Sequence, residues 1–449
     1  MKYLIGLDIG TSSVKGVLLS EKGAVCRTAC EKFTYIKDGR GMVEIPAKSF
    51  LNACLSAIRH LAEGAEGEIA GLCASAATGN TLLLDGDGEP LTPIINWQDT
   101  RVTTEAEEVL GKMDKDAFYR QIGWPFGGTT FPLAHLSYWK VHLPKTYKKA
   151  KYALMSTEYL YHYLAGESGI STSAGTPFFL IDQKTGKYIP SLLKKLGLSE
   201  EMLPRVGKCG ERCGYIRKER EKESGLCAGT PLILGSFDHP SAARGTGILK
   251  EGQLLLSCGT SWVTFSPIMD REKAAKKGFL IDPFLSEKGG AWGTMTSVPS
   301  VSARINEYVS RYIDNSDKAF KTLSSLAAEA EKGAGGLTLN ITEAPSDEKV
   351  KGYEKKNIAR AIMEGVVNLL KAKIELLRES GIAADEAVMV GGPSEDPMWR
   401  KLISEMCNMP VFAAHGQSAG AVGAAMMAGI GVGLYENEED AIGKWGDEK

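Results

Sequence analysis

A short phrase occurs twice in the chain, once in each half. Residues 7–14 read LDIGTSSV and residues 256–263 read LSCGTSWV. In each copy an apolar run leads into Gly-Thr-Ser and a second apolar run follows, which indicates a tight β-hairpin with a small-residue turn. Glycine lets backbone N–H groups come close to an anion, and the hydroxyls add donors, so such a turn can bind a phosphate group. Two copies predict two domains that face one nucleotide.

Composition narrows the class of protein. The 449 residues suffice for two domains with full cores, and a net charge of −2 gives no electrostatic reason to expect nucleic acid or an anionic membrane as a partner. The basic run Lys145–Lys151 is interpreted as a solvated helical face. The stretch Gln417–Tyr435 is mostly Ala and Gly, which favours a tightly packed buried helix over a membrane span.

The cysteines and the first residues point to the cytoplasm. Nine scattered cysteines do not resemble a disulfide framework, and their spacing does not match that of structural zinc sites. The chain enters a strand at Tyr3–Gly6, with no charged and apolar leader ahead of it. We therefore expect a cytoplasmic protein.

Hydrophobic periodicity predicts a β-β-β-α-β order in the first half, and a second half that repeats the plan from Gln253 onward. Expected strands are residues 3–7, 14–19, 28–35, 69–74, 254–257, 262–266 and 388–392; expected helices are residues 49–61, 300–313, 317–331 and 355–380. This order predicts two doubly wound α/β domains, with a boundary near residues 241–247 and ligands bound between the domains.

Four further segments resemble the FGGY carbohydrate kinases, a branch of the actin and hexokinase superfold. They are Gly235–Ala243, Arg360–Val366, Val390–Ser394 with the following Pro397–Arg400, and Gly420–Ala425. They occur in the family's order, and the resemblance covers residues 3 to about 433. It implies an α/β fold of two actin-like (ribonuclease H-like) domains with a central cleft. Residues 1–243 would form the sugar and catalytic-base side, and residues 244–449 the nucleotide side.

Two carboxylates are the candidates for phosphoryl-transfer chemistry. Asp238 matches the family's catalytic aspartate, and a carboxylate at a strand end can accept the proton of a sugar hydroxyl; the alternative is a helix N-cap. His239 beside it would contact the substrate or only pack. Asp8 ends the first strand beside Gly10, so it would hold Mg²⁺, unless it merely caps the turn.

The sugar site is expected on two loops. The segment Asn96–Arg101 resembles the family's sugar-binding segment, in which a carboxylate and a guanidinium can bind several hydroxyls while an indole covers the carbon skeleton. For Asp99 and Arg101 a surface salt bridge is the alternative. The candidate substrate contacts are Thr78, Asn80, Trp97, Gln98, Asp99, Arg101, Asp238 and His239.

The nucleotide is expected on three glycine turns. Gly391-Gly392-Pro393-Ser394 would lie under the adenosine, although the family's third glycine is Pro393 here. The link between Gly333 and Lys356 is also shorter than in the family. This difference affects what the resemblance implies about the substrate and the oligomeric state, and a homodimer stays an open alternative. The candidate nucleotide contacts are Gly10, Thr11, Ser12, Gly259, Thr260, Ser261, Gly391, Gly392 and Ser394.

Competing motifs fail. Gly416–Gly420 fits the G-x-S-x-G pattern of α/β-hydrolases, but no histidine follows His415 to complete a triad, and the chain has no P-loop. We therefore expect an ATP- and Mg²⁺-dependent kinase whose partners are ATP and a ketose or polyol. The alternatives are a catalytically weak nucleotide-dependent sensor or assembly protein on the same fold, and an iron–sulfur ATPase activator.

Overall fold

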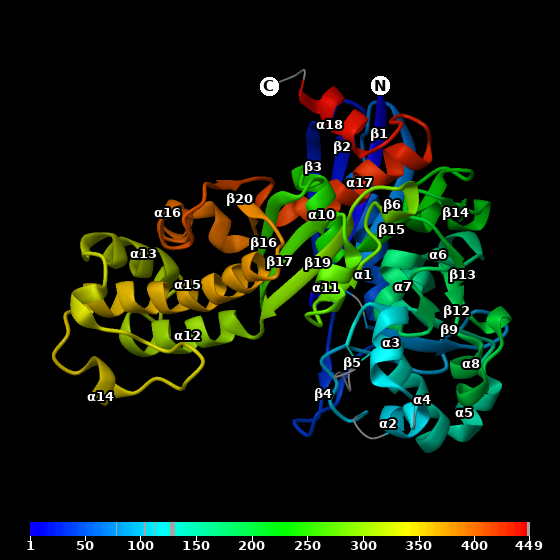
Figure 1. Ribbon diagram of the computed structural model, residues 1–449. Coiled ribbons are helices and arrows are strands. Elements are labelled where there is room, and N and C mark those ends of the chain that lie inside the picture. Colours follow the sequence, from blue (N-terminus) through cyan, green and yellow to red (C-terminus); the bar gives the residue numbers. More distant parts are fainter. Residues whose placement is uncertain (78, 103–104, 112, 126–130, 447–449) are drawn as a thin grey trace. The chain divides into compact units, whose positions relative to one another are not determined.

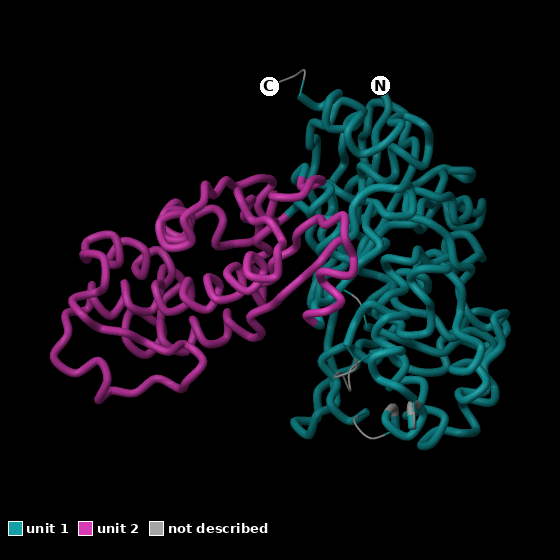
Figure 2. The backbone as a smooth tube through the Cα atoms, viewed as in Figure 1, with its two compact units in different colours: residues 1–247, 278–292, 418–449 teal, residues 248–277, 293–417 magenta. Residues whose placement is uncertain are grey.

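The chain forms two compact units (Figure 2). The computed structural model describes residues 1–77, 79–102, 105–111, 113–125 and 131–446. Unit 1 is formed by Met1–Gly247, Gly278–Trp292 and Ser418–Lys449, and unit 2 by Ile248–Lys277 and Gly293–Gln417. The boundary predicted after residue 243 lies close to the first crossing at Gly247. However, residues 278–292 and 418–449 return to unit 1, which the single predicted boundary does not provide for.

A six-stranded mixed sheet is the centre of unit 1 (Figure 1). Its strands, in spatial order, are β14 (Arg212–Tyr215), β15 (Pro231–Phe237), β6 (Glu68–Ala76), β1 (Lys2–Ile9), β2 (Ser13–Ser20) and β3 (Val25–Lys32). β1 pairs antiparallel with β2 and parallel with β6, and β6 pairs parallel with β15. The strands predicted at 3–7, 14–19 and 69–74 are confirmed.

The third predicted strand lies earlier in the chain than expected. It was placed at residues 28–35, but β3 ends at Lys32. Lys32 pairs with Ser13, the first residue of β2, so the partner strand offers no further ladder positions. The pairing partner, which periodicity does not reveal, sets the end of β3.

The two faces of this sheet pack against different helices. Ile5 and Leu7 of β1 lie in one core cluster with α1 (Ala47–Ala62), whereas Leu4 lies in a second cluster with α17 (Ala419–Gly431). Because side chains alternate along a strand, Asp8 shares the face of Leu4. The alternation of β1 therefore directs Asp8 to the side of the sheet that α17 covers.

Helix α17 approaches its neighbours so closely that only glycine fits at the contacts. A Cβ on Gly6 of β1 would lie 1.9 Å from the backbone oxygen of Ala421. A Cβ on Gly423 would lie 1.8 Å from the backbone oxygen of Ser241 in α10 (Asp238–Thr246). Every residue of α17 from Ala419 to Gly429 is buried, which confirms the buried helix predicted within 417–435.

The remaining elements of unit 1 surround this core. A five-stranded sheet contains, in order, β4 (Ile36–Lys37), β5 (Val43–Ile45), β8 (Ile94–Ile95), β7 (Thr81–Leu84) and β9 (Tyr152–Met155). Two short pairs are β10 (Gly169–Ser171) with β13 (Arg205–Gly207) and β11 (Ile181–Asp182) with β12 (Lys187–Tyr188). The other helices are α2 (Glu105–Leu110), α3 (Lys115–Ile122), α4 (Pro132–His142), α5 (Pro144–Lys149), α6 (Ser156–Ala165), α7 (Thr172–Gly175), α8 (Pro190–Leu196), α9 (Glu221–Ser224) and α18 (Glu438–Gly446), and the segment 278–292 contains β18 (Leu280–Asp282).

Unit 2 is built on the second copy of the repeated phrase. Neighbouring strands of its sheet are β19 (Trp292–Val298), β17 (Trp262–Ile268), β16 (Gly252–Cys258), β20 (Ala384–Val390) and β21 (Val411–Ala413). Its helices are α11 (Arg271–Ala275), α12 (Val301–Tyr312), α13 (Ala319–Glu329), α14 (Asp347–Val350), α15 (Lys355–Glu379) and α16 (Pro397–Cys407). The three long helices and the strands predicted at 254–257 and 262–266 are confirmed, whereas the strand predicted at 388–392 begins earlier, at Ala384, and ends at Val390. Within the part of the chain that the structure describes, no helix has the length and apolar content to cross a membrane.

The contact between α17 and α10 gives a stability prediction. In Gly423→Ala the added methyl carbon would lie 1.8 Å from a backbone oxygen that cannot yield like an exposed side chain. We expect the free energy of unfolding to fall by about 1–3 kcal/mol, the usual cost of overpacking a core. Urea unfolding monitored by circular dichroism measures this change.

Gly443 provides the matched control. It is an exposed glycine in α18, and nothing lies within 4 Å of the position that a Cβ would occupy. Gly443→Ala should therefore leave the stability unchanged or raise it by up to ~1 kcal/mol, because alanine favours the helix. Equal effects of the two substitutions would contradict the close packing of α17.

Candidate active site

Asp8 lies between β6 and the first turn of α17. The Ser75 hydroxyl of β6 lies 3.5 Å from Asp8 Oδ1, and a Cβ on Gly420 would lie 2.5 Å from Asp8 Oδ2. Burial raises the pKa of Asp8 to about 7, with a further contribution from the charge of Asp238; Lys15 and Ser75 act in the opposite direction. The carboxylate is thus held in a site where its charge lacks full compensation.

Asp238 is the first residue of α10 and directly follows β15. Its side chain is 31% exposed, and its Oδ1 accepts a hydrogen bond from the backbone N–H of His239 at 2.8 Å. The His239 ring nitrogen Nε2 lies 3.9 Å from the same oxygen. Because the charge of Asp238 raises the pKa of Asp8, the two carboxylates lie within electrostatic reach of each other. Two partly exposed carboxylates within electrostatic reach of each other suit both proton transfer and cation binding.

The packing of α10 on α17 fixes these two carboxylates. The Ser241 hydroxyl donates to the backbone oxygen of Gly420 at 2.8 Å. One helix begins with Asp238, and the first turn of the other contacts Asp8. Sequence reasoning missed Ser75 and assigned Gly420 no role at Asp8, because both act through neighbours distant in sequence.

The first Gly-Thr-Ser turn meets the predicted sugar-binding segment. The Trp97 indole N–H lies 3.4 Å from Thr11 Oγ1, and the Trp97 backbone N–H donates to Asn80 Oδ1 at 3.0 Å. Asn80 is buried, so it supports the loop and presents little surface to a ligand. The Gly10 N–H donates to the backbone oxygen of Ser13 at 2.9 Å, which closes the turn, and Ser12 is exposed. Thr78 lies outside the described residues.

Asp99 and Arg101 form a network with a third residue, Glu44. Asp99 is fully buried; its Oδ2 accepts from the Val43 N–H at 2.9 Å and from Arg101 Nη2 at 2.6 Å. Glu44 of β5 accepts from the same Nη2 at 2.7 Å. Burial lowers the pKa of Arg101, but hydrogen bonds to Asp99 and Glu44 outweigh it and raise the pKa above its usual value.

This network differs from an exposed ion pair. The Arg101 side chain is 21% exposed and Asp99 is completely enclosed, so Asp99 positions Arg101. Gln98 is half-buried, and its N–H donates to Asn96 Oδ1 at 2.9 Å. Sequence reasoning missed Glu44, because a charged residue between two apolar ones, Val43 and Ile45, is ordinary strand alternation and does not indicate its partner.

Unit 2 brings its two predicted nucleotide loops together. β16 and β20 are parallel neighbours, so the loops that follow them lie at the same edge of the sheet. Gly391 has φ +93°, and a Cβ there would lie 2.4 Å from the backbone oxygen of Cys258, so this position requires glycine. Gly392 and Thr260 are exposed. The two loops therefore present backbone and a hydroxyl to the solvent at one edge.

Serine side chains brace these loops. The Ser302 hydroxyl donates to the backbone oxygen of Gly259 at 2.6 Å, and the Ser300 N–H donates to Ser261 Oγ at 3.2 Å. Ser394 is buried, and its hydroxyl donates to the Gly391 oxygen at 2.7 Å. The side chains of Ser394 and Ser261 thus stabilise this conformation of the loops. Thr260, by contrast, is exposed to solvent.

The residues of unit 1 fit a hydrated divalent cation better than a protein-enclosed one. Among the described residues no three His, Cys, Asp or Glu side chains form a metal-binding group. Mg²⁺ prefers oxygen ligands and commonly keeps several waters while binding one or two carboxylates and phosphate oxygens. Asp8, a carboxylate whose pKa is raised by burial and by the charge of Asp238, matches that requirement.

Comparisons with known proteins cover nearly the whole chain. Family models for the N-terminal and C-terminal domains of the FGGY family of carbohydrate kinases match residues 3–245 and 336–432. The xylulose kinase of Bacillus subtilis (strain 168) is 26% identical over 98% of this chain and 90% of its own length.

Solved structures agree on the fold. A ligand-bound xylulose kinase and a gluconate kinase, both from Lactobacillus acidophilus, superpose with TM-scores of 0.87 at 20% and 21% identity, covering 99% of this chain and 92% of each of theirs. Because two kinases with different sugars match equally well, this likeness shows the fold alone. The predicted α/β fold and kinase class are confirmed: the chain belongs to the FGGY family of carbohydrate kinases.

Proposed function

We propose that this carbohydrate kinase transfers the γ-phosphoryl group of ATP to a hydroxyl group of a ketose or polyol. The observation that supports this most is the partly exposed carboxylate of Asp238, which lies at the carboxyl end of β15 within electrostatic reach of the carboxylate of Asp8. A protein that only binds a nucleotide has no need for an accessible base in this position.

In the proposed reaction a sugar hydroxyl oxygen attacks the γ-phosphorus while its proton passes to the Asp238 carboxylate. The bond between the γ-phosphorus and the β,γ-bridging oxygen breaks, and ADP leaves. Phosphoryl transfer depends mainly on positioning and on charge stabilisation. Trp97, Gln98 and Arg101 would orient the sugar. Asn80 and Asp99 would hold Trp97 and Arg101 in place through hydrogen bonds. His239 adjoins the base and would contact the sugar near the reacting hydroxyl.

The nucleotide is assigned to the glycine turns. Gly259, Thr260, Ser261, Gly391, Gly392 and Ser394 would bind it in unit 2, and Gly10, Thr11 and Ser12 would bind phosphate in unit 1. Asp8 would hold Mg²⁺ through water. When bound, Mg²⁺ neutralises charge on the phosphate oxygens.

The charges around Arg101 support a neutral sugar. One guanidinium is paired with two carboxylates, Asp99 and Glu44, so this network carries a net negative charge. A sugar acid would bring a further carboxylate to a group whose positive charge is already compensated. The name of the Bacillus subtilis relative agrees with a ketose as substrate. A screen of ketoses, polyols and aldonic acids for ADP release tests the choice of substrate, and aldonic acids alone being accepted would overturn it.

The same screen separates the kinase from a nucleotide-dependent sensor or assembly protein. A kinase releases ADP much faster with its sugar than without. A sensor shows only the basal rate with every sugar in the panel.

Asp238→Asn should lower kcat by ~10²–10⁴-fold, since the amide keeps the shape of the side chain but cannot accept the proton. ATP affinity, measured by calorimetry, should stay nearly unchanged. Near-normal turnover in this variant would remove Asp238 from the role of base.

Thr260→Val removes an exposed hydroxyl from the second Gly-Thr-Ser turn while keeping the side-chain volume. Loss of a hydrogen bond to a charged phosphate should weaken ATP binding or transition-state binding by about 1–3 kcal/mol. Calorimetry and steady-state kinetics measure the change, and the KM for sugar is the internal control because it should not move. Unchanged ATP affinity and rate would make the turn structural.

Arg101→Lys keeps the charge but loses the planar fork that holds Asp99 and Glu44 together. We expect the KM for sugar to rise by about tenfold or more, the effect of losing one charged hydrogen bond, while basal ATP hydrolysis stays the same.

Arg212 is the matched control for Arg101→Lys. It is an exposed arginine whose guanidinium lies 4.7 Å from the ring centroid of Tyr215. Arg212→Lys should change neither activity. If Arg101→Lys behaves like this control, the segment from Asn96 to Arg101 does not contact the sugar.

A further inference from the structure

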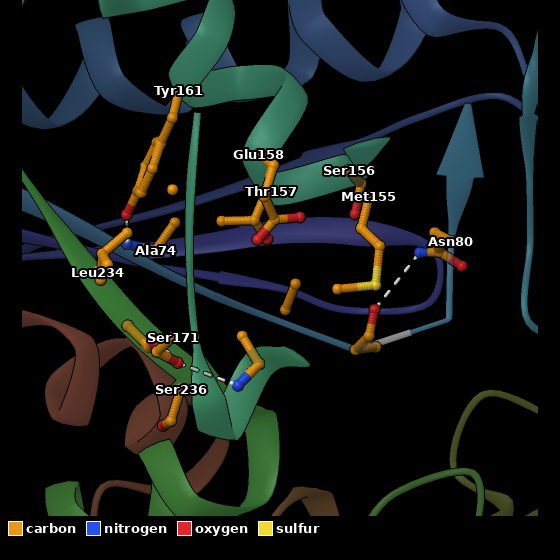
Figure 3. Close-up of a pocket in the computed structure, with 15 residues that line it drawn as sticks. Ala74, Asn80, Met155, Ser156, Thr157, Glu158, Tyr161, Ser171, Leu234 and Ser236 are labelled. Atoms are coloured by element: carbon orange, nitrogen blue, oxygen red, sulfur yellow. Dashed lines mark hydrogen bonds between the residues drawn. The ribbon is translucent and has the colours of Figure 1, made fainter. Parts of the chain in front are cut away.

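A small cavity lies at the carboxyl ends of β6 and β15 in unit 1 (Figure 3). Its walls include Asn80 after β6, Glu158 on α6, Ser171 at the end of β10 and Ser236 on β15. The space open to the centre of a water molecule amounts to about 10 Å³, which is room for about one water. Asn80 supports Trp97, and Ser236 precedes Asp238 by two residues, so the cavity adjoins both halves of the proposed sugar site.

Glu158 is the unusual group in this wall. Its side chain is buried, and Oε2 has no hydrogen-bond partner. Burial raises the pKa of Glu158 to about 8, against a small opposing effect of its own backbone N–H, so the carboxyl group is largely neutral at pH 7. The Ser236 hydroxyl is likewise buried without a partner. A buried carboxyl oxygen and a buried hydroxyl that both line this cavity and lack hydrogen-bond partners indicate an internal water.

The ionisable groups around Glu158 do not compensate a charge on it. Those that sense its charge are Tyr161 on the same helix, Tyr188 on β12 and Cys213 on β14. Burial raises the pKa of all three, so they are neutral too. No cation among the described residues affects the pKa of Glu158. The neutral acid is therefore the form that the fold accommodates.

Side chains from this region hold the end of β15. The register between β15 and β6 shifts between Leu234 and Phe237. The Tyr161 hydroxyl bridges the two strands: it donates to the Ile233 oxygen at 2.7 Å and accepts from the Ala74 N–H at 2.8 Å. The Ser171 hydroxyl donates to the Gly235 oxygen at 2.6 Å. Hydrogen bonds from α6 and from the end of β10 thus support the strand end that precedes Asp238.

We propose that Glu158 is a positioning residue: its neutral carboxyl group, together with one water in the cavity, fixes the ends of β6 and β15 that carry Asn80 and Asp238. This inference rests on the proposed function for its catalytic consequence. Ionisation of Glu158 would place an unpaired charge in the cavity and disturb the strand end. The sugar-dependent rate should then fall as the pH rises through the value at which Glu158 loses its proton.

The sign of the stability effect follows from the raised pKa. Between the ordinary pKa of glutamic acid, ~4.3, and about 8, the folded protein binds one proton more than the unfolded chain at this residue. The contribution of Glu158 to stability is therefore complete below that range and decreases as the pH rises through it. Glu158→Gln keeps the shape and the hydrogen-bonding groups but removes this titration.

The test compares wild type, Glu158→Gln, Glu158→Leu and the control Glu66→Gln, which changes an exposed carboxylate of the same unit. Glu158→Gln should keep kcat at pH 7, lose the alkaline fall in kcat near pH 8, and unfold with a flatter dependence of stability on pH. Glu158→Leu should lower kcat by ~10–10²-fold through misplacement of the reacting groups while the KM for ATP stays constant. Glu66→Gln should match wild type in every measurement.

Two readouts do not require a sugar. Urea unfolding across the pH range follows the titration, and the infrared carbonyl band of a buried protonated carboxyl group should be present in wild type and absent in Glu158→Gln. If no sugar is accepted, the proposed function fails, and these readouts, with basal ATP hydrolysis, still decide on Glu158. The inference would be overturned if the free energy of unfolding depended on pH in the same way in wild type and Glu158→Gln. A kcat of Glu158→Leu equal to that of wild type would also overturn it.

Discussion

The close packing of α17 is the constraint on which the rest of unit 1 depends. Gly6 lets the helix lie against β1, and Gly423 and Gly245 let it lie against α10, where a Cβ would come within about 2 Å of backbone atoms. Protein interiors are packed at the density of organic crystals, so such contacts leave no room for adjustment. The same helix places Gly420 against the carboxylate of Asp8. The geometry of the two acidic residues is therefore determined by backbone-to-backbone contact, which is more rigid than contact between side chains.

Charge is distributed unevenly over the residues of unit 1 that the proposed reaction uses. Arg101 is paired with two carboxylates, whereas the charge of Asp238, together with burial, raises the pKa of Asp8. Repulsion between like charges is costly in a partly buried site, and a divalent cation removes it. These charges agree with the proposed binding of metal-bound nucleotide near Asp8 and of a neutral polyol near Arg101. Both preferences arise from a handful of residues on β1, β5, α10 and the loop after β8 (Figure 1).

Much of the fold and part of the candidate site could be predicted from the sequence, because they depend on local patterns of residues. The two Gly-Thr-Ser hairpins, the buried helix within 417–435 and the strand ahead of Asp238 all follow from apolar periodicity and glycine placement. Glu44 could not be found in this way, since only the pairing of β5 brings it to Arg101. The burial of Asp99 was missed for a similar reason: its partner Val43 lies 56 residues away. The end of β3 and the return of residues 278–292 to unit 1 likewise depend on partners that spacing does not reveal.

The discontinuity of unit 1 has a consequence for the order in which the protein is made. A ribosome releases the strands of the first sheet early, but the helix that covers one of its faces is among the last segments to emerge. During that interval Leu4, Val17 and Cys73 have no apolar cover, while the residues of unit 2 are being synthesised. Nascent chains in this state expose a hydrophobic sheet face, which is the kind of surface that chaperones bind and that aggregates form on. A premature stop between Gly293 and Gln417 would therefore damage unit 1 as well as the unit in which the stop occurs, because it removes α17.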